Sequence, residues 1–277
     1  MNEETFTLQN KPASYTINVK GRLMDLSRPC VMGILNVTPD SFYANSRMQT
    51  ADAIRNRVKQ IVDEGAKIID VGACSTRPGG NPAGEEEEMK RLEMALPIVR
   101  EVYPDAVISV DTFRASVARR AVEEYGVDII NDVEEGSDPD MFRTVAGLGV
   151  PYILMSKAAS LHDMLIDLSR EVQELRSFGQ KDIILDPGFG FGKEPVAGNL
   201  TLMNEMEKLL VMELPILVGI SRKRMIHQLL GITPQESLNG TTVLNTIALI
   251  KGAAILRVHD VRQAVEAVKI YETMIRS

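Results

Sequence analysis

The chain reads Ile-Ile-Leu-Asp-Pro-Gly-Phe-Gly-Phe-Gly-Lys from Ile183 to Lys193. The aliphatic residues at its start have the composition of a buried strand, and Pro187 and Gly188 end that strand. Asp186 therefore lies at the strand end, where its carboxylate can hold a ligand or cap the next helix. Three glycines alternate with two phenylalanines beyond it, which lets backbone and aromatic faces approach something flat.

The same order of aliphatic run, polar residue or glycine, loop and amphipathic helix recurs along the chain. Near-continuous apolar runs separated by helices are typical of parallel strands covered on both faces. Eight such runs favour an α/β fold of the (β/α)8 type, the TIM barrel, over an open doubly wound sheet. The runs lie at residues 31–35, 68–71, 107–110, 127–130, 152–155, 183–185, 216–218 and 254–258.

The helices between these runs are predicted from apolar spacing and from the residues at their ends. Four glutamates open the predicted helix 85–102, where they suit the positive end of a helix dipole and need no catalytic role. The helices are expected at residues 52–64, 85–102, 114–124, 139–148, 164–178, 200–212, 238–251 and 261–275.

The first 28 residues are polar and mixed, and they precede the repeating pattern. Residues 15–19 alternate like an edge strand before the turn residue Gly21, which predicts a small N-terminal β-hairpin. No Pro/Ser-rich linker interrupts the remainder. We therefore expect one domain over residues 1–277, with residues 1–28 as a hairpin extension.

Composition limits the classes of function. The chain has 277 residues, 44% hydrophobic and 25% charged, without a run long enough to cross a bilayer, so we expect a globular chain with no membrane partner. The net charge of -7 argues against a general nucleic-acid partner. Two cysteines beside strand-like runs and an N-terminus without a basic-then-apolar signal predict a reducing, cytoplasmic setting.

Polar side chains follow most of the predicted strands. In a TIM barrel the active-site groups come from the carboxyl ends of the strands and from the loops after them. These positions are Asn36, Thr76, Arg77, Asp111, Asn131, Asp186, Lys223, Arg257 and His259. Asp70 lies inside a strand rather than past its end, and it is interpreted as a structural carboxylate.

The side chains at these positions divide into two chemistries. Asp111, Asn131 and Asp186 carry acceptor oxygens that suit adjacent N–H donors of a planar heterocycle. The basic side chains and His259 suit phosphate oxygens. The residues therefore predict a ligand with a donor-rich flat head and an anionic tail. Asn36 can contact the anionic tail by way of Mg²⁺, because this ion usually binds one or two protein oxygens together with phosphates and waters.

Seven segments, in order, resemble the dihydropteroate synthase family from about Met32 to the C-terminus. The segments are Gly33–Phe42, Ser75–Gly79, Ser109–Thr112, Ile130–Asp132, Leu185–Lys193, Ser221–Lys223 and Arg257–Asp260. The resemblance implies condensation of 6-hydroxymethyl-7,8-dihydropterin pyrophosphate with 4-aminobenzoate, giving dihydropteroate and pyrophosphate in folate synthesis. It also implies a homodimer and a sulfonamide target.

The resemblance assigns roles to the same positions. It implies that Asp111, Asn131, Asp186 and Lys223 hold the pterin with Met155 on its face, that Asn36 binds Mg²⁺, and that Arg257 and His259 hold the pyrophosphate. Thr76 and Arg77 would belong to a mobile second loop. The aminobenzoate pocket is expected from Phe189, Arg224 and the loop of residues 75–79.

Two stretches depart from the family pattern. Tyr43 to Ser46 stand where the family commonly has Ser-Asp-Gly-Gly, and Ser156 and Lys157 stand where it has His-Met after the fifth strand. Arg224, where many members carry Ser, leaves sulfonamide affinity open.

Two alternative functions remain. The methyltetrahydrofolate:corrinoid methyltransferases are pterin-binding barrels without a pyrophosphate to bind, and the basic motifs count against them. A non-catalytic pterin-binding paralogue is supported only by the altered fifth loop.

Overall fold

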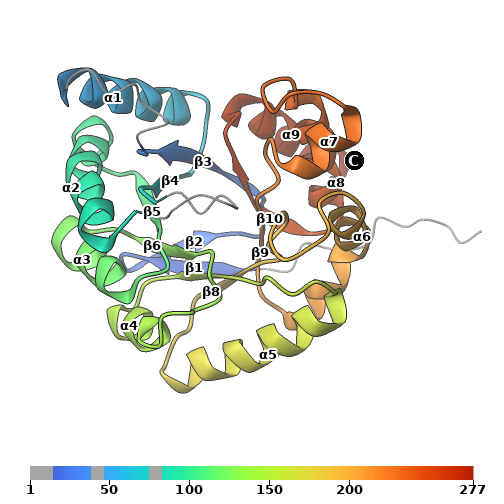
Figure 1. Ribbon diagram of the computed structural model, residues 1–277, viewed down its shortest axis with the longest axis horizontal. Coiled ribbons are helices and arrows are strands. Elements are labelled where there is room, and N and C mark those ends of the chain that lie inside the picture. The colour runs from blue at the N-terminus through green and yellow to red at the C-terminus, as the bar shows by residue number, and fades with distance from the viewer. Residues whose placement is uncertain (1–14, 39–46, 75–82, 277) are drawn as a thin grey trace, which may run out of the picture.

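A closed parallel barrel forms the centre of the computed structural model, which describes residues 15–38, 47–74 and 83–276 (Figure 1). Its neighbours run in the order β10, β3, β4, β5, β6, β7, β8 and β9. The predicted TIM barrel is therefore confirmed. The strands are β3 (Cys30–Asn36), β4 (Ile68–Gly72), β5 (Val107–Asp111), β6 (Ile129–Asp132), β7 (Tyr152–Met155), β8 (Ile183–Asp186), β9 (Ile216–Val218) and β10 (Ala253–Val258).

Helices surround the barrel and cover its outer face (Figure 1). They are α1 (Arg47–Asp63), α2 (Glu85–Val102), α3 (Ala115–Tyr125), α4 (Met141–Leu148), α5 (Leu161–Ser177), α6 (Ala197–Glu205), α7 (Arg224–Leu230), α8 (Leu238–Ile250) and α9 (Val261–Met274). The predicted helix 200–212 is instead α6 followed by the 3₁₀ helix η2 (Met206–Met212). The sequence analysis missed α7, because its seven residues are too few to show a helical apolar period.

Alternation along the strands separates two apolar clusters. Ile68 and Ile129 belong to an inner cluster with Met32, Ile153, Ile184 and Ile255, whereas their sequence neighbours Ile69 and Ile130 pack outward against the helices. Successive side chains of a strand point to opposite faces, so a parallel barrel needs apolar residues on both. Because both faces of the barrel strands are buried, the strands appear in the sequence as near-continuous aliphatic runs.

The N-terminal hairpin closes the amino end of the barrel. Strands β1 (Thr16–Val19) and β2 (Arg22–Asp25) pair in antiparallel register, as predicted. Ile17, Val19 and Leu26 are buried in the inner cluster of the barrel. The hairpin therefore supplies part of the barrel core, and the carboxyl ends of the strands, where TIM-barrel sites form, lie at the opposite end. That residues 1–277 form one domain stays a prediction, since residues 1–14 lie outside the described part of the chain.

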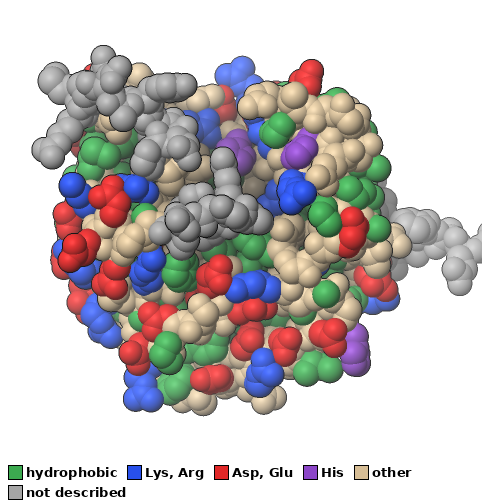
Figure 2. Space-filling view, viewed as in Figure 1, with side chains coloured by type: hydrophobic (Ala, Val, Ile, Leu, Met, Phe, Trp, Pro, Cys, Tyr) green, Lys and Arg blue, Asp and Glu red, His purple; other side chains and the backbone are tan. Residues whose placement is uncertain are grey.

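Among the described residues, no helix is both long and apolar enough to pass through a membrane. The face seen in Figure 2 carries acidic and basic side chains side by side over the outer helices. Ion pairs join neighbouring outer helices, for example Arg120 on α3 with Glu93 on α2, 2.9 Å apart.

Candidate active site

The register of the parallel strands places polar positions side by side at the carboxyl end of the barrel. Asn36 is level with Gly72, Gly72 with Asp111, and Asp111 with Asn131. Asp111 and Asn131 each lie two residues after an inward-facing position of their strand. Both side chains therefore point into the mouth of the barrel.

Arg257 connects two carboxylates across this mouth. Its Nε donates to Asp70 Oδ2 at 2.6 Å, and its Nη2 donates to Asp111 Oδ2 at 2.6 Å. Burial raises the pKa of Asp111 to about 7, although the charge of Arg257 opposes that shift. Arg257 is expected to hold the pyrophosphate and Asp111 to hold the pterin. The two expected groups of residues are therefore in direct contact at this hydrogen bond.

Asp70, which the sequence analysis interpreted as a structural carboxylate, also lies at the mouth of the barrel. Its side chain is fully buried, and it pairs with Arg257 and with the Nδ2 group of Asn131, at 3.3 Å from Oδ2. The signal that identifies it is alternation: Ile68, Asp70 and Gly72 share the inner face of β4. Asp70 therefore reaches the mouth of the barrel although it lies within β4 and not after its end.

Asn131 and Asp186 supply acceptor oxygens on neighbouring parts of the rim. Asn131 is 1% exposed, and its Oδ1 has no hydrogen-bond partner among the described residues. Asp186 accepts from the backbone N–H of Gly188 at 2.8 Å. Burial raises the pKa of Asp186, and the positive charge of Lys223 opposes the increase. A buried acceptor without a donor is suited to a ligand that brings one.

Lys223 occupies the rim beside Asp186. Its Nζ donates to the carbonyl oxygen of Phe189 and lies 4.7 Å from the centre of the Phe191 ring. Burial lowers its pKa to about 8, while Asp186 raises it. A second lysine, Lys193, donates to the carbonyls of Gly188 and Phe191 at 3.1 and 3.0 Å and thereby holds the loop after β8 together.

The two phenylalanines of that loop have different environments. The Phe189 side chain is fully buried in the outer hydrophobic core, whereas the Phe191 side chain is half-buried beside Lys223. The prediction that Phe189 lines a substrate pocket is not tested, but its place in the outer core favours Phe191 as the aromatic residue of this loop that faces the mouth. The sequence could not choose between them, because both follow a glycine in the same repeat. Met155, at the end of β7, is fully buried next to Gly188.

The glycines of the loop approach protein backbone. A Cβ on Gly188 would stand 2.0 Å from the carbonyl oxygen of Ser156, and one on Gly192 would stand 1.8 Å from that of Lys157. Both glycines have positive φ angles, of 64° and 63°. The sequence analysis expected these glycines to let the backbone approach a flat ligand. At Gly188 and Gly192 the backbone instead approaches the loop after β7.

His259 is held from three sides. Its backbone N–H donates to Ser221 Oγ at 3.2 Å, its Nδ1 lies 3.1 Å from the same oxygen, and its carbonyl accepts from Arg57 Nη2 at 2.6 Å. Burial lowers the pKa of His259 to about 4, and the charge of Arg257 lowers it further. His259 is therefore a neutral N–H donor near pH 7, rather than a cation.

Asn36 is the described residue suited to Mg²⁺. Its Oδ1 would lie 3.1 Å from a Cβ on Gly72, so a larger residue at position 72 would crowd that oxygen. Among the described residues, no three acidic, histidine or cysteine side chains gather as a metal site. One neutral oxygen fits Mg²⁺ that is bound mainly by phosphates and waters.

Thr76 and Arg77 lie outside the described residues. The chain on either side of residues 75–82 is anchored to neighbouring helices and loops. Arg91 donates to the carbonyl of Ala73 at 2.8 Å, and Arg114 donates to that of Ala83 at 2.7 Å.

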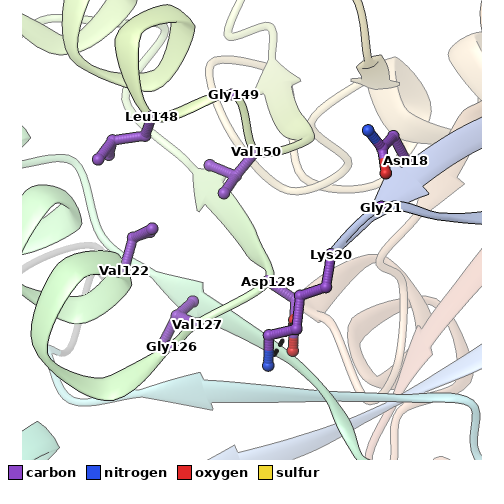
Figure 3. Close-up of a pocket in the computed structure, with 10 residues that line it drawn as sticks. All are labelled: Asn18, Lys20, Gly21, Val122, Gly126, Val127, Asp128, Leu148, Gly149 and Val150. Atoms are coloured by element: carbon purple, nitrogen blue, oxygen red, sulfur yellow. Dashed lines mark ion pairs between the residues drawn. The ribbon is translucent and has the colours of Figure 1, made fainter.

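A cavity of about 290 Å³ lies at the other end of the barrel, next to the hairpin (Figure 3). Lys20 extends across it to Asp128, with 2.9 Å between Nζ and Oδ1. The other oxygen of Asp128 accepts from Arg100 and from the N–H of Ile108. Asp128 is thus ion-paired through both of its oxygens, and this cavity is separate from the site at the mouth.

Comparison with known proteins identifies the family. Residues 32–259 match the model of the pterin binding enzymes. The dihydropteroate synthase of Bacillus subtilis is 37% identical over 99% of this chain and 95% of its own, and that of Escherichia coli is 38% identical over 91% and 94%. The structure of Xanthomonas albilineans dihydropteroate synthase with 4-aminobenzoic acid superposes with a TM-score of 0.87, at 34% identity over 95% of this chain and 99% of that one. The chain therefore belongs to the dihydropteroate synthases, transferases of the pterin-binding TIM-barrel family.

Proposed function

We infer that the mouth of this barrel condenses 6-hydroxymethyl-7,8-dihydropterin pyrophosphate with 4-aminobenzoate, giving 7,8-dihydropteroate and pyrophosphate. The observation that carries the assignment of the site is the acceptor set of Asp111, Asn131 and Asp186 beside Lys223 and Arg257. A pterin carries N–H donors along one edge of a flat ring. Three inward acceptors on separate strands match such an edge.

Binding of the pterin would use the acceptor oxygens at the mouth of the barrel. The free Oδ1 of Asn131 and the carboxylates of Asp111 and Asp186 would accept its N–H groups. Hydrogen bonds to a charged acceptor contribute about 1.5–3 kcal/mol each. Met155, Thr76 and Lys223 complete the proposed substrate-binding set, in which Met155 packs against the ring.

The chemical step exchanges one bond for another at the methylene carbon of the pterin. The bond from that carbon to the pyrophosphate oxygen breaks, a bond to the aminobenzoate nitrogen forms, and the nitrogen loses a proton to solvent. The dihydropterin ring can delocalise the positive charge that develops on the carbon. Positive charge and N–H donors aimed at the departing oxygens would lower the barrier. Arg257, Lys223 and the neutral His259 at the mouth would supply them. Arg77, which lies outside the described residues, stays a predicted member of this set.

Asn36 would hold Mg²⁺ beside the pyrophosphate. When bound, the ion neutralises charge on the leaving phosphate oxygens. No protein nucleophile is needed, and Cys74, whose thiol lies near Arg114 and the Ala83 carbonyl, is outside the proposed reaction.

The aminobenzoate would lie between Phe191 and the N-terminal end of α7. Phe191 offers an aromatic face next to Lys223, and the exposed Arg224 offers a cation for the carboxylate. The relative from Xanthomonas albilineans holds 4-aminobenzoic acid in its structure. Arg224 in place of a small residue would also alter the entry of sulfonamides into this pocket.

The outer helices support a homodimer. Large apolar side chains are exposed on three helices near the C-terminus, of which α8 and α9 pack together. These are Leu229 and Leu230 on α7, Val243 and Ile250 on α8, and Ile270 and Met274 on α9. An apolar group of this kind is typical of a protein interface.

An activity assay with both substrates, with and without Mg²⁺, tests the proposal. We expect dihydropteroate to form only with both substrates, and its formation to slow when Mg²⁺ is chelated. Asp186→Asn should weaken binding of 6-hydroxymethylpterin in calorimetry by more than about tenfold, or 1.4 kcal/mol. An unchanged dissociation constant would contradict the proposed pterin site.

A further inference from the structure

We propose that Asp70 is a positioning residue of the pterin site, which fixes the amide of Asn131 with its oxygen toward the ligand and holds the guanidinium of Arg257 at the same time. The inference rests on the proposed pterin site and extends it by one residue, which lies inside a strand. Asp70 reaches both partners from the inner face of β4, and its side chain is fully buried.

The chemistry of a carboxylate settles which way the amide of Asn131 turns. An ionised carboxylate only accepts hydrogen bonds, so Asn131 has to present its NH2 group to Asp70. Nδ2 of Asn131 lies 3.3 and 3.5 Å from the two oxygens of Asp70, a long hydrogen bond shared between them. The opposite orientation would place an amide oxygen against negative charge.

The consequence for the ligand is selectivity. With Nδ2 turned to Asp70, Asn131 presents Oδ1 on its other side, and this oxygen has no partner among the described residues although the side chain is 1% exposed. A free asparagine can rotate to serve a donor or an acceptor. In the asparagine held by Asp70 the oxygen keeps its direction, so the ligand atom facing Oδ1 must carry a proton.

Arg257 is oriented by the same carboxylate. Its Nε is taken by Asp70 and its Nη2 by Asp111, each at 2.6 Å. None of the hydrogen bonds among the described residues uses Nη1 of Arg257. That edge of the guanidinium is left for the ligand, and its direction follows from the two carboxylates.

A double-mutant cycle tests this inference. Calorimetry with 6-hydroxymethylpterin, which lacks the pyrophosphate, would be carried out on the wild type, Asp70→Asn, Asn131→Ala and the double variant. If Asp70 acts through Asn131, each single substitution weakens binding by about tenfold, and the double variant is weaker than Asn131→Ala by less than about threefold, because effects in one network are not additive. Independent effects would multiply to about a hundredfold and would overturn the proposal.

Asp128→Asn is the matched control. Asp128 is also a buried, ion-paired carboxylate, but it lies at the opposite end of the barrel. We expect it to lower the melting temperature without changing pterin affinity. If Asp70→Asn behaves as Asp128→Asn does, Asp70 is only structural. If the wild type itself fails to bind the pterin, the proposed function is wrong, and the two failures are thereby distinguished.

A crystal structure of the wild type with 6-hydroxymethylpterin gives a second test that needs no folded variant. The amide of Asn131 should remain within hydrogen-bond distance of Asp70, with the other end of the amide facing a ligand N–H. An amide rotated away from Asp70 in the complex would refute the assignment.

Discussion

Ser221 and His259 contact each other through a single hydroxyl group. Ser221 Oγ accepts from the backbone N–H of His259 at 3.2 Å and lies 3.1 Å from its Nδ1. With one lone pair occupied by the backbone N–H, the hydroxyl is free to donate a hydrogen bond to an unprotonated Nδ1. The imidazole proton is then on Nε2, the nitrogen that can donate to a pyrophosphate oxygen.

Ser221→Ala removes that hydrogen bond to Nδ1 and lets His259 change tautomer. We expect kcat/KM for the pterin pyrophosphate to fall by about tenfold, or 1.4 kcal/mol of transition-state stabilisation. Binding of plain 6-hydroxymethylpterin should stay constant, which calorimetry on the same variant checks. Equal losses with both ligands would show that Ser221 supports the pterin site as a whole.

His259 also makes the fold sensitive to acid. Its pKa is lowered from 6.5 to about 4 by burial, so the unfolded chain binds a proton in this range before the folded one does. The free energy of unfolding should therefore fall as pH decreases from 6.5 to 4 and be unaffected by this group above 6.5. Urea titrations of His259→Gln against wild type should show a smaller loss of stability across that window. A parallel loss in both proteins would contradict the assignment.

The shifted pKa values of Asp111 and Lys223 predict a narrow pH optimum for pterin binding. The pKa of Asp111 is raised to about 7 and that of Lys223 is lowered to about 8, both mainly by burial. Affinity should increase as pH rises through 7, where the carboxylate ionises, and decrease above 8, where the ammonium loses its charge. The apparent values belong to the coupled group. Calorimetry from pH 6 to 9 checks the shape, and Asp111→Asn should remove the acid limb alone.

Phe189 and Phe191 form a matched pair for mutation. Phe189→Ala should lower the free energy of unfolding by about 3–5 kcal/mol, because it empties a buried core position. Phe191→Ala should raise the KM for 4-aminobenzoate with little loss of stability. Denaturant titration and steady-state kinetics on both variants decide the matter. A KM effect confined to Phe189→Ala would reverse the proposed assignment.

Gly192→Ala should disrupt the loop that carries Lys223's partners. An added Cβ would meet the backbone of Lys157 at 1.8 Å, which no side-chain rotation can relieve. Gly231 is the control, since its φ of 64° matches the 63° of Gly192 and nothing lies within 4 Å of an added Cβ. Gly231→Ala should cost only the left-handed strain of about 1–2 kcal/mol. We expect pterin binding to be lost in Gly192→Ala alone.

Val243 tests the proposed homodimer. Val243→Glu places a charge among the exposed apolar side chains of α7, α8 and α9, where burial without a partner is unfavourable. Light scattering after gel filtration should report a dimer for wild type and a monomer for the variant. Ile166→Glu, an equally exposed position on α5, should leave the mass unchanged. A monomeric wild type would refute the dimer.

The sequence by itself determined the barrel and the positions of most of the proposed site. Aliphatic runs that end in a polar residue indicate parallel strands covered on both faces, because side chains on both faces of the sheet then pack against apolar neighbours. Asp111, Asn131 and Asp186 could be selected in this way, since all three end a run. The sequence did not predict the short helix α7 or the division of residues 197–212 into α6 and η2. Segments of so few residues do not establish a helical apolar period.

Only the tertiary structure decided how these groups act together. Asp70 and Arg257 are 187 residues apart, and their hydrogen bond exists because closure of the barrel brings β4 and β10 to the same mouth. The different environments of Phe189 and Phe191 and the lowered pKa of His259 depend likewise on which side chain is buried and which charges surround it. Burial and proximity are properties of the assembled barrel, which local sequence does not encode.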